Sequence, residues 1–292
     1  MDRRRRPRAL TAPIEGSLPY RGTFGAPRPG PLAQLPLPPA PMPSHLGGRP
    51  LKAWRYVGVF SAELMICVAT ARVGRARQSF WAVWDRRAQR LHERTWLSAG
   101  GVRFASGLAQ VSDGRARLLL SFAETPGVET VCPSAGGYAW THKQGGIGVS
   151  GTLDLGDGQP RAVHARAVID DTAAYYERHT RWRWCAGVGT DVGARPLAWN
   201  LVEGVNDPAV GSERTVWVDG APREVGPITI APGVDAVGDL RFHAEVTREH
   251  RQNLPVVRSR YRQPFGTFSG VLPDGPRLAE GWGVMEEHDA WW

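Results

Sequence analysis

The chain has 292 residues, enough for one large or two ordinary domains, and with 42% hydrophobic residues it can bury a substantial core. The 35 glycines and 24 prolines favour a β-rich protein with many turns over a helix bundle. Half of the net charge of +8 falls in the first eight residues, so it indicates at most non-specific contact with phosphates and no specific nucleic-acid partner.

Several classes of protein are disfavoured by motifs that the sequence lacks. The three cysteines, Cys67, Cys132 and Cys185, are widely spaced and form no metal-binding pattern, which fits free thiols in a reducing cytoplasm. No signal peptide and no apolar run of membrane-spanning length is present. Nucleophile-elbow, phosphate-loop, zinc-protease and dinucleotide fingerprints are absent, so we predict a cytoplasmic protein without metal, cofactor or membrane span.

The first part of the chain has an uneven composition. Residues 1–15 are basic and without pattern, which predicts a disordered tail. Residues 26–50 are rich in proline and predict an irregular connection that packs over a surface. We include this loop in an N-terminal β domain over residues 16–170.

From Trp54 onward, short runs of alternating apolar and polar residues follow one another at the spacing expected for strands of a barrel or sandwich. Asp170 and Asp171 are interpreted as helix caps and not as a catalytic pair, so residues 171–181 are predicted as a short helix between two sheets. Beyond it, residues 182–188 and 197–205 alternate on either side of a turn, which predicts a hairpin. The second β domain is assigned to residues 171–292.

A set of motifs resembles one family. They are Tyr-Arg-Gly-Thr-Phe-Gly (20–25), Trp-Arg-Tyr-Val-Gly-Val-Phe (54–60), Ser-Phe-Trp-Ala-Val-Trp-Asp (79–85), Tyr-Ala-Trp-Thr-His-Lys (138–143), Gly-Val-Asn-Asp-Pro (204–208), Tyr-Arg-Gln-Pro-Phe-Gly-Thr-Phe-Ser-Gly (261–270) and Gly-Val-Met-Glu-Glu-His-Asp (283–289). From Leu18 onward the chain resembles the DUF2804 family of unknown function, which is distantly similar to the AttH and carotenoid 1,2-hydratase group. That resemblance implies two tandem calycin-like (lipocalin-like) β-barrels or sandwiches, and relatives that hydrate or cyclise isoprenoids and polyketides.

The densest titratable cluster lies near the C-terminus. In a strand over residues 281–287, Glu286 and Glu287 would point to opposite faces, and a carboxyl group aimed into an apolar barrel would have a raised pKa. We therefore name Glu286 or Glu287 as a candidate acid, with His288 or Asp207 managing a water molecule. The alternative is a strand whose acidic groups form salt bridges with the abundant arginines.

The candidate ligand-binding residues are His179, Asn206, Trp182, Trp184, Trp199 and Lys143. Each has a structural alternative: a half-buried histidine, an ordinary turn, core tryptophans and a lysine at a solvated edge. The leading functional hypothesis is a hydrophobic small molecule held in an aromatic-lined cavity, with hydration, isomerisation or cyclisation by acid–base chemistry. A non-catalytic carrier or sensor of a lipid-like ligand is the alternative, and glycan binding or hydrolysis a weaker one. The sequence does not determine the oligomeric state.

Overall fold

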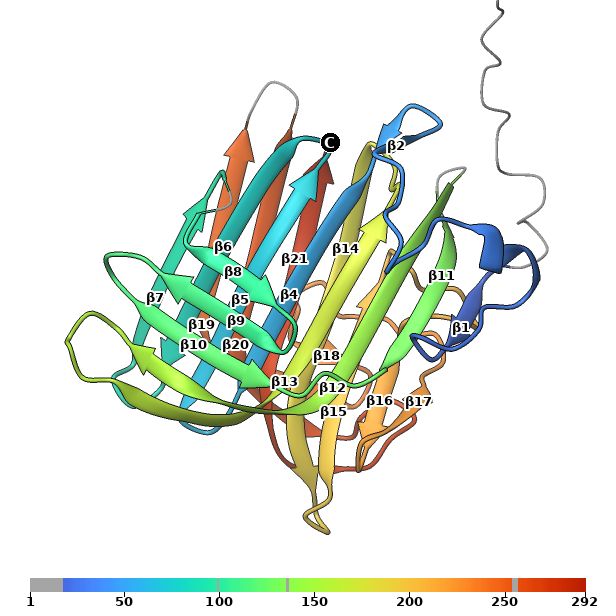
Figure 1. Cartoon of the computed structure of the whole chain (residues 1–292). Coiled ribbons are helices and arrows are strands. Elements are labelled where there is room, and N and C mark those ends of the chain that lie inside the picture. Colours follow the sequence, from blue (N-terminus) through green and yellow to red (C-terminus); the bar gives the residue numbers. More distant parts are fainter. Residues whose placement is uncertain (1–17, 99, 135–136, 254–256) are drawn as a thin grey trace, which may run out of the picture.

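The structure is a computed structural model that describes residues 18–98, 100–134, 137–253 and 257–292. Two antiparallel sheets account for nearly all of it, and each is curled into a half-barrel (Figure 1). The first sheet is built in the order β7 (Arg90–Trp96), β6 (Ala76–Asp85), β5 (Leu64–Val73), β4 (Lys52–Phe60), β13 (Arg161–Ala174), β12 (Gly137–Asp154), β10 (Arg117–Phe122), β9 (Leu108–Ser112) and β8 (Val102–Ala105). At one end of β12 the sheet is extended by β11 (Val128–Ser134) and β1 (Tyr20–Gly22).

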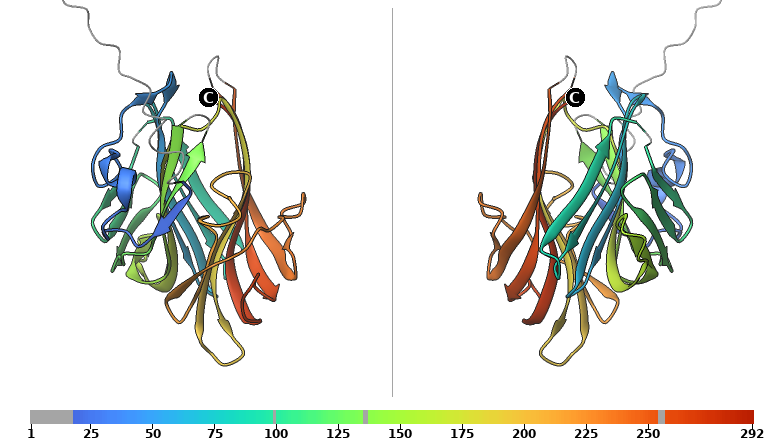
Figure 2. Two further views of the ribbon diagram at one scale, coloured as in Figure 1. Left: turned by 90° about the vertical axis from the view of Figure 1, so that its right-hand side faces the viewer. Right: turned by 90° about the vertical axis from the view of Figure 1, so that its left-hand side faces the viewer.

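The second sheet is formed by the rest of the chain. Its order is β17 (Ala221–Glu224), β16 (Thr215–Val218), β15 (Pro196–Glu203), β14 (His179–Asp191), β21 (Leu278–Trp291), β20 (Arg258–Gly270), β19 (Leu240–Asn253) and β18 (Ala236–Val237). Figure 2 shows the two sheets as curved layers set side by side, with the earlier half of the chain in one and the later half in the other. This confirms the all-β class and the two consecutive curled sheets that the sequence predicts.

Three of the apolar clusters lie within and between the two sheets. A first inner core lies within the curl of the first sheet and includes Val57, Trp81 and Leu118. A second inner core lies within the second sheet and includes Cys185 and Trp199. Side chains of both sheets meet in the intersheet core, which comprises Tyr56, Phe60, Met65, Cys67, Ala69, Ala82, Trp84, Val128, Val168, Trp182, Trp184, Ala186, Val188, Ala198, Val202, Trp217, Phe265 and Val284. Each sheet is therefore covered on both faces.

The hairpin β14–β15 illustrates how alternation produces this arrangement. Trp182 and Trp184 point into the intersheet core, whereas Cys185 and Trp199 point into the second inner core. Successive side chains of a strand leave on opposite faces, so a strand between two cores carries apolar residues on both. The alternation predicted for residues 182–188 and 197–205 is confirmed.

The helix predicted over residues 171–181 is wrong. β13 continues to Ala174, residues 175–178 connect the sheets, and β14 begins at His179. The two consecutive tyrosines of the connection are both buried, Tyr175 in one cluster and Tyr176 in another. Only an extended backbone places neighbouring side chains on opposite sides, so tertiary burial outweighs the capping potential of the aspartates.

The proline-rich loop packs over a surface as predicted. It contains a short 3-10 helix, η1 (Gly30–Gln34), and the small hairpin β2 (His45–Leu46) and β3 (Arg49–Pro50). Its leucines, with Met42, form a cluster against the first sheet that includes Val131 and Trp140. The predicted tail, residues 1–15, lies outside the described residues.

Candidate functional site

A cavity of about 300 Å³ lies between the two sheets, beside the C-terminus. Its aromatic walls include Trp54 and Tyr56 from β4, Trp182 and Trp184 from β14, and Tyr261 from β20. The C-terminal Trp292 also lines it. This volume is at the lower end of the usual range for small-molecule sites, about 300–1,000 Å³. The cavity therefore has the size of a small-molecule site and a largely aromatic lining.

Glu286 of β21 reaches this cavity from the second sheet, and only 7% of the residue is exposed. Its carboxylate accepts hydrogen bonds from the Trp182 indole N–H at 2.9 Å, the Tyr261 hydroxyl at 2.8 Å and the Gln263 amide at 3.1 Å. Burial raises the pKa of Glu286 to about 7, although the hydrogen bonds from Tyr261 and Trp182 oppose the shift. The positive charge of Arg248, which also lines the cavity, lowers the pKa of Glu286 as well, but burial outweighs it, so the group can hold or release a proton near neutral pH.

His288 lies two residues further along the same strand and on the same face as Glu286. Its Nε2 is 2.7 Å from the Ser259 hydroxyl, and its ring packs on Trp182 with centroids 4.3 Å apart. Burial lowers the pKa of His288 to about 3, so the imidazole is neutral at physiological pH. Nδ1 is buried and has no protein partner in the described part of the chain. It can therefore hydrogen-bond a water molecule or a ligand.

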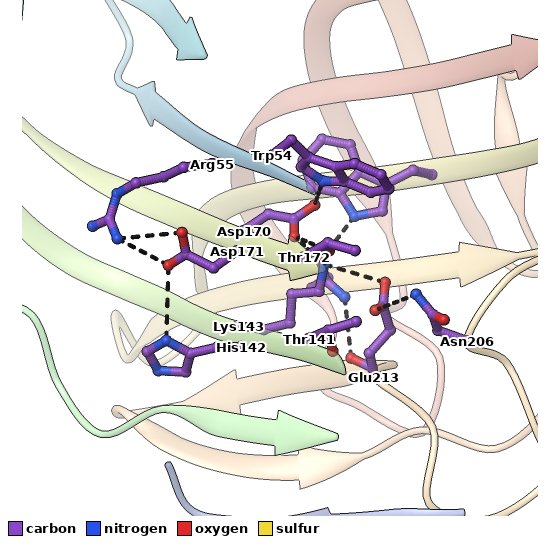
Figure 3. A network of polar contacts seen from close by, with 12 residues as sticks. Trp54, Arg55, Thr141, His142, Lys143, Asp170, Asp171, Thr172, Asn206 and Glu213 are labelled. Atoms are coloured by element: carbon purple, nitrogen blue, oxygen red, sulfur yellow. Dashed lines mark hydrogen bonds and ion pairs between the residues drawn. The ribbon is translucent and has the colours of Figure 1, made fainter. Parts of the chain in front are cut away.

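A buried charge network that joins the first sheet to the segment between β15 and β16 lies at the same cavity (Figure 3). The Lys143 ammonium of β12 forms ion pairs with Asp170 of β13 and, at 3.3 Å, with Glu213. Asn206 donates to Glu213 at 3.1 Å and to the Tyr176 hydroxyl at 2.6 Å. Burial alone would lower the pKa of Lys143, but the two carboxylates outweigh it and raise the pKa. For Glu213, burial raises the pKa even though Lys143 opposes the shift.

Each sheet contributes one tryptophan–acid unit to the cavity lining, Trp54–Asp170 from the first and Trp182–Glu286 from the second. Trp54 lies opposite Thr172 in the strand register and donates its indole N–H to Asp170, two residues earlier, at 3.2 Å. Trp182 lies opposite His288 and donates to Glu286, again two residues earlier. The two indoles stack almost in parallel, with centroids 5.9 Å apart and 8° between their planes. The units differ in the neighbour of the acid, which is Lys143 in the first sheet and Gln263 in the second.

Six of the predicted site residues are brought together in this cavity, namely Glu286, His288, Asn206, Trp182, Trp184 and Lys143. Their positions follow from strand alternation, because Glu286 and His288 leave β21 on the face that carries Val284 into the intersheet core. Asn206 is the exception, since it lies in a loop with a left-handed backbone, φ 51°, which asparagine tolerates.

The other four predicted residues lie outside the cavity. Glu287 leaves the opposite face of β21, pairs with Arg183 at 3.3 Å, and has a side chain that is 42% exposed. Asp207 accepts a hydrogen bond from the Gly204 amide at 2.8 Å as a turn residue. His179 pairs with Asp289 at 2.8 Å. Trp199 is enclosed in the second inner core, because it alternates away from the intersheet face.

Sequence reasoning missed several groups of the cavity. Asp170 was interpreted as a helix cap, although the alternation of Val168, Asp170 and Thr172 continues the strand and could have identified it. Tyr261 lies in one of the motifs that carry the family resemblance but was given no role. Glu213 lies just before β16 and carries no signal in the sequence.

Together the fold and the site define an all-β protein of two curled antiparallel sheets, with an aromatic cavity and buried titratable groups between them. Residues 115–292 match the family described as "Domain of unknown function (DUF2804)", and the chain belongs to this family. The match confirms the resemblance noted from the motifs. No curated protein sequence matches the chain.

Solved structures that are similar to the chain include the following three. A protein provisionally assigned as AttH from Nitrosomonas europaea aligns with TM-score 0.43 and 13% identity over 82% of this chain and 92% of that one. Kievitone hydratase from Nectria haematococca aligns with TM-score 0.49 and 8% identity over 81% and 88%. CghA with Sch210972 aligns with TM-score 0.44 and 11% identity over 82% and 87%.

The described residues contain no helix that is long and apolar enough to cross a membrane. Nor do they contain a group of three or more His, Cys, Asp or Glu side chains placed to hold a metal ion.

Proposed function

We propose that the chain binds an apolar, unsaturated small molecule in the cavity and transfers a proton to it from Glu286. The reaction class is hydration, isomerisation or cyclisation. The observation that carries the proposal is the Glu286 carboxyl group, which is buried among aromatic side chains with a pKa of about 7. A general acid is most effective when its pKa lies near the working pH.

The aromatic walls suit the charge that such a reaction creates. Protonation of a carbon–carbon double bond moves the Glu286 proton to one carbon and leaves a cation on the other. The faces of Trp54, Trp182 and Tyr261 can stabilise that cation through their ring quadrupoles, each by about 0.5–2 kcal/mol. The cation then adds water and releases a proton, loses a proton from a neighbouring carbon, or is attacked by another double bond and then loses a proton, which gives the three reaction types. In each case the Glu286 carboxylate takes up the released proton and is restored as the acid.

His288 has a positioning role in this scheme. Its neutral imidazole offers Nδ1 to a water molecule while Ser259 fixes the ring through Nε2. With a pKa of about 3 it is too weak a base to take a full proton at neutral pH, so we assign it the orientation of water.

The test compares Glu286→Gln with Glu287→Gln, the adjacent acid on the opposite face. Each protein is incubated in D2O with a panel of isoprenoid and aryl alkenes, and deuterium incorporation is measured by mass spectrometry. We expect incorporation with the wild type and with Glu287→Gln, and a loss of about 100-fold or more with Glu286→Gln. Equal incorporation by both variants would refute the assignment of Glu286.

The same experiment distinguishes an enzyme from a carrier. Native mass spectrometry of the protein purified from its host would show a bound molecule in both cases. A carrier would return that molecule unchanged and without deuterium after incubation in D2O.

A further inference from the structure

The chain contains only two lysines, Lys52 and Lys143, and every other strongly basic residue is an arginine. Both lysines line the intersheet cavity, and each is only 1% exposed. Arginine would supply a permanent positive charge at either position, but it cannot lose its proton in a protein. The two amines of the cavity are therefore a chemical feature that the rest of the sequence does not repeat.

The surroundings of the two amines differ. Lys143 is held between the carboxylates of Asp170 and Glu213, which accounts for a buried ammonium there. Lys52, at the start of β4, has no carboxylate within ion-pair distance among the described residues. It donates to the backbone carbonyl of Tyr176 at 2.6 Å and lies 5.6 Å from the centre of the Trp292 ring. The charged form of Lys52 is thus favoured by one hydrogen bond and one aromatic ring, but by no opposite charge.

An amine without an anionic partner loses its proton more readily. Burial, followed by the positive charge of Arg49, lowers the pKa of Lys52 to about 8. At pH 7.5 about one quarter of such a group is neutral, compared with about 0.1% of an ordinary lysine. The neutral amine keeps its hydrogen bond to Tyr176 and has a free lone pair.

We propose that Lys52 is a nucleophile of the cavity and forms a reversible imine with the carbonyl group of an apolar aldehyde or ketone. The lone pair of Nζ attacks the carbonyl carbon, and the two amine hydrogens leave with the carbonyl oxygen as one molecule of water. This inference rests on the proposed binding of apolar molecules in the cavity but not on proton transfer from Glu286. It names the ligand class as one that carries a carbonyl group.

The test uses cinnamaldehyde with sodium cyanoborohydride at pH 7.5, because the hydride reduces an imine to a stable secondary amine. The sites of labelling are identified by intact mass and peptide mapping. We expect Lys52 to be labelled about 10-fold or more faster in the folded protein than in protein unfolded in guanidinium chloride. Lys143 and the terminal amine are internal controls within the same molecule and should not share this acceleration.

A matched variant and a matched probe complete the design. Lys52→Arg keeps the charge and a donor for Tyr176 and should abolish the accelerated labelling, while wild-type protein alone already decides the result if the variant fails to fold. Cinnamyl alcohol, which has the same skeleton without the carbonyl, measures binding through quenching of tryptophan fluorescence. Quenching without accelerated labelling of Lys52 would overturn the inference and leave the proposed function standing. Preferential labelling of Lys143 would overturn it as well.

Discussion

Replacing Glu286 with Gln should change how the stability of the protein depends on pH. The folded-state pKa of Glu286 is about 7, whereas the usual pKa of a glutamate is 4.5. Since the folded pKa is the higher one, the folded state is favoured below pH 4.5, and this advantage is lost as the pH rises through 7. One pKa unit corresponds to about 1.4 kcal/mol, so the ionised carboxylate costs the wild type about 3 kcal/mol above pH 7.

The glutamine variant has no proton to lose at this position. Its altered hydrogen bonds to Trp182 and Tyr261 add a change in the free energy of unfolding that does not depend on pH. The difference in unfolding free energy, variant minus wild type, should therefore rise by about 2–3 kcal/mol between pH 5 and pH 8. His288 titrates in the opposite sense, but burial, Asp289 and His250 set its pKa, so its contribution cancels in the difference.

The measurement is urea unfolding of both proteins at half-unit steps from pH 5 to pH 8. Glu287→Gln is the control, because Glu287 is part-exposed and its ion pair with Arg183 is worth less than about 1 kcal/mol, too little to produce the rise expected for Glu286→Gln. A flat curve for Glu286→Gln would refute the buried acid. It would mean that the carboxyl group is solvated, or that an unseen cation pairs with it.

Two further substitutions test the packing around the site. Asp170→Asn should destabilise the protein by about 3 kcal/mol, because it breaks a buried ion pair with Lys143. Asp171→Asn should cost less than about 1 kcal/mol, because the ion pair of Asp171 with Arg55 is partly exposed. Urea unfolding at pH 7 compares the two variants, and equal losses of stability would contradict the buried network. Trp199→Ala should cost about 3–5 kcal/mol by leaving a void in the second inner core, yet quenching by cinnamyl alcohol should persist in the folded protein, and a loss of quenching would show that this core shapes the cavity.

The strands could be predicted from the sequence because their side chains alternate. A period of two puts Trp182 and Trp184 on one face of their strand, and Leu197 and Trp199 on one face of theirs. The structure has both, the first pair in the intersheet core and the second in the second inner core. The 171–181 helix could not be rejected in this way, since an aspartate followed by alanines is a common helix start. The strand there depends on Lys143 and Arg55, which bind Asp170 and Asp171 from distant positions in the chain.

The candidate acid could be narrowed to two adjacent residues but no further. Glu286 and Glu287 are equivalent in sequence, and only the register of β21 against β14 decides which one faces the intersheet core. Asp207 and His179 are close to the site along the chain but point elsewhere. Glu213 and Lys52 could not be recognised, because their burial depends on how one sheet covers the other.

The two tryptophan–acid units give the cavity chemically different ends. Lys143, Asp170 and Glu213 form an ion-pair network on one side, while the other side carries the buried acid Glu286, the neutral imidazole of His288 and the guanidinium of Arg248. A symmetric cavity would bind a ligand equally well in either orientation. Here an elongated molecule with one polar terminus gains more in one orientation than in the other, so its reactive atoms would meet the same side chains on every encounter.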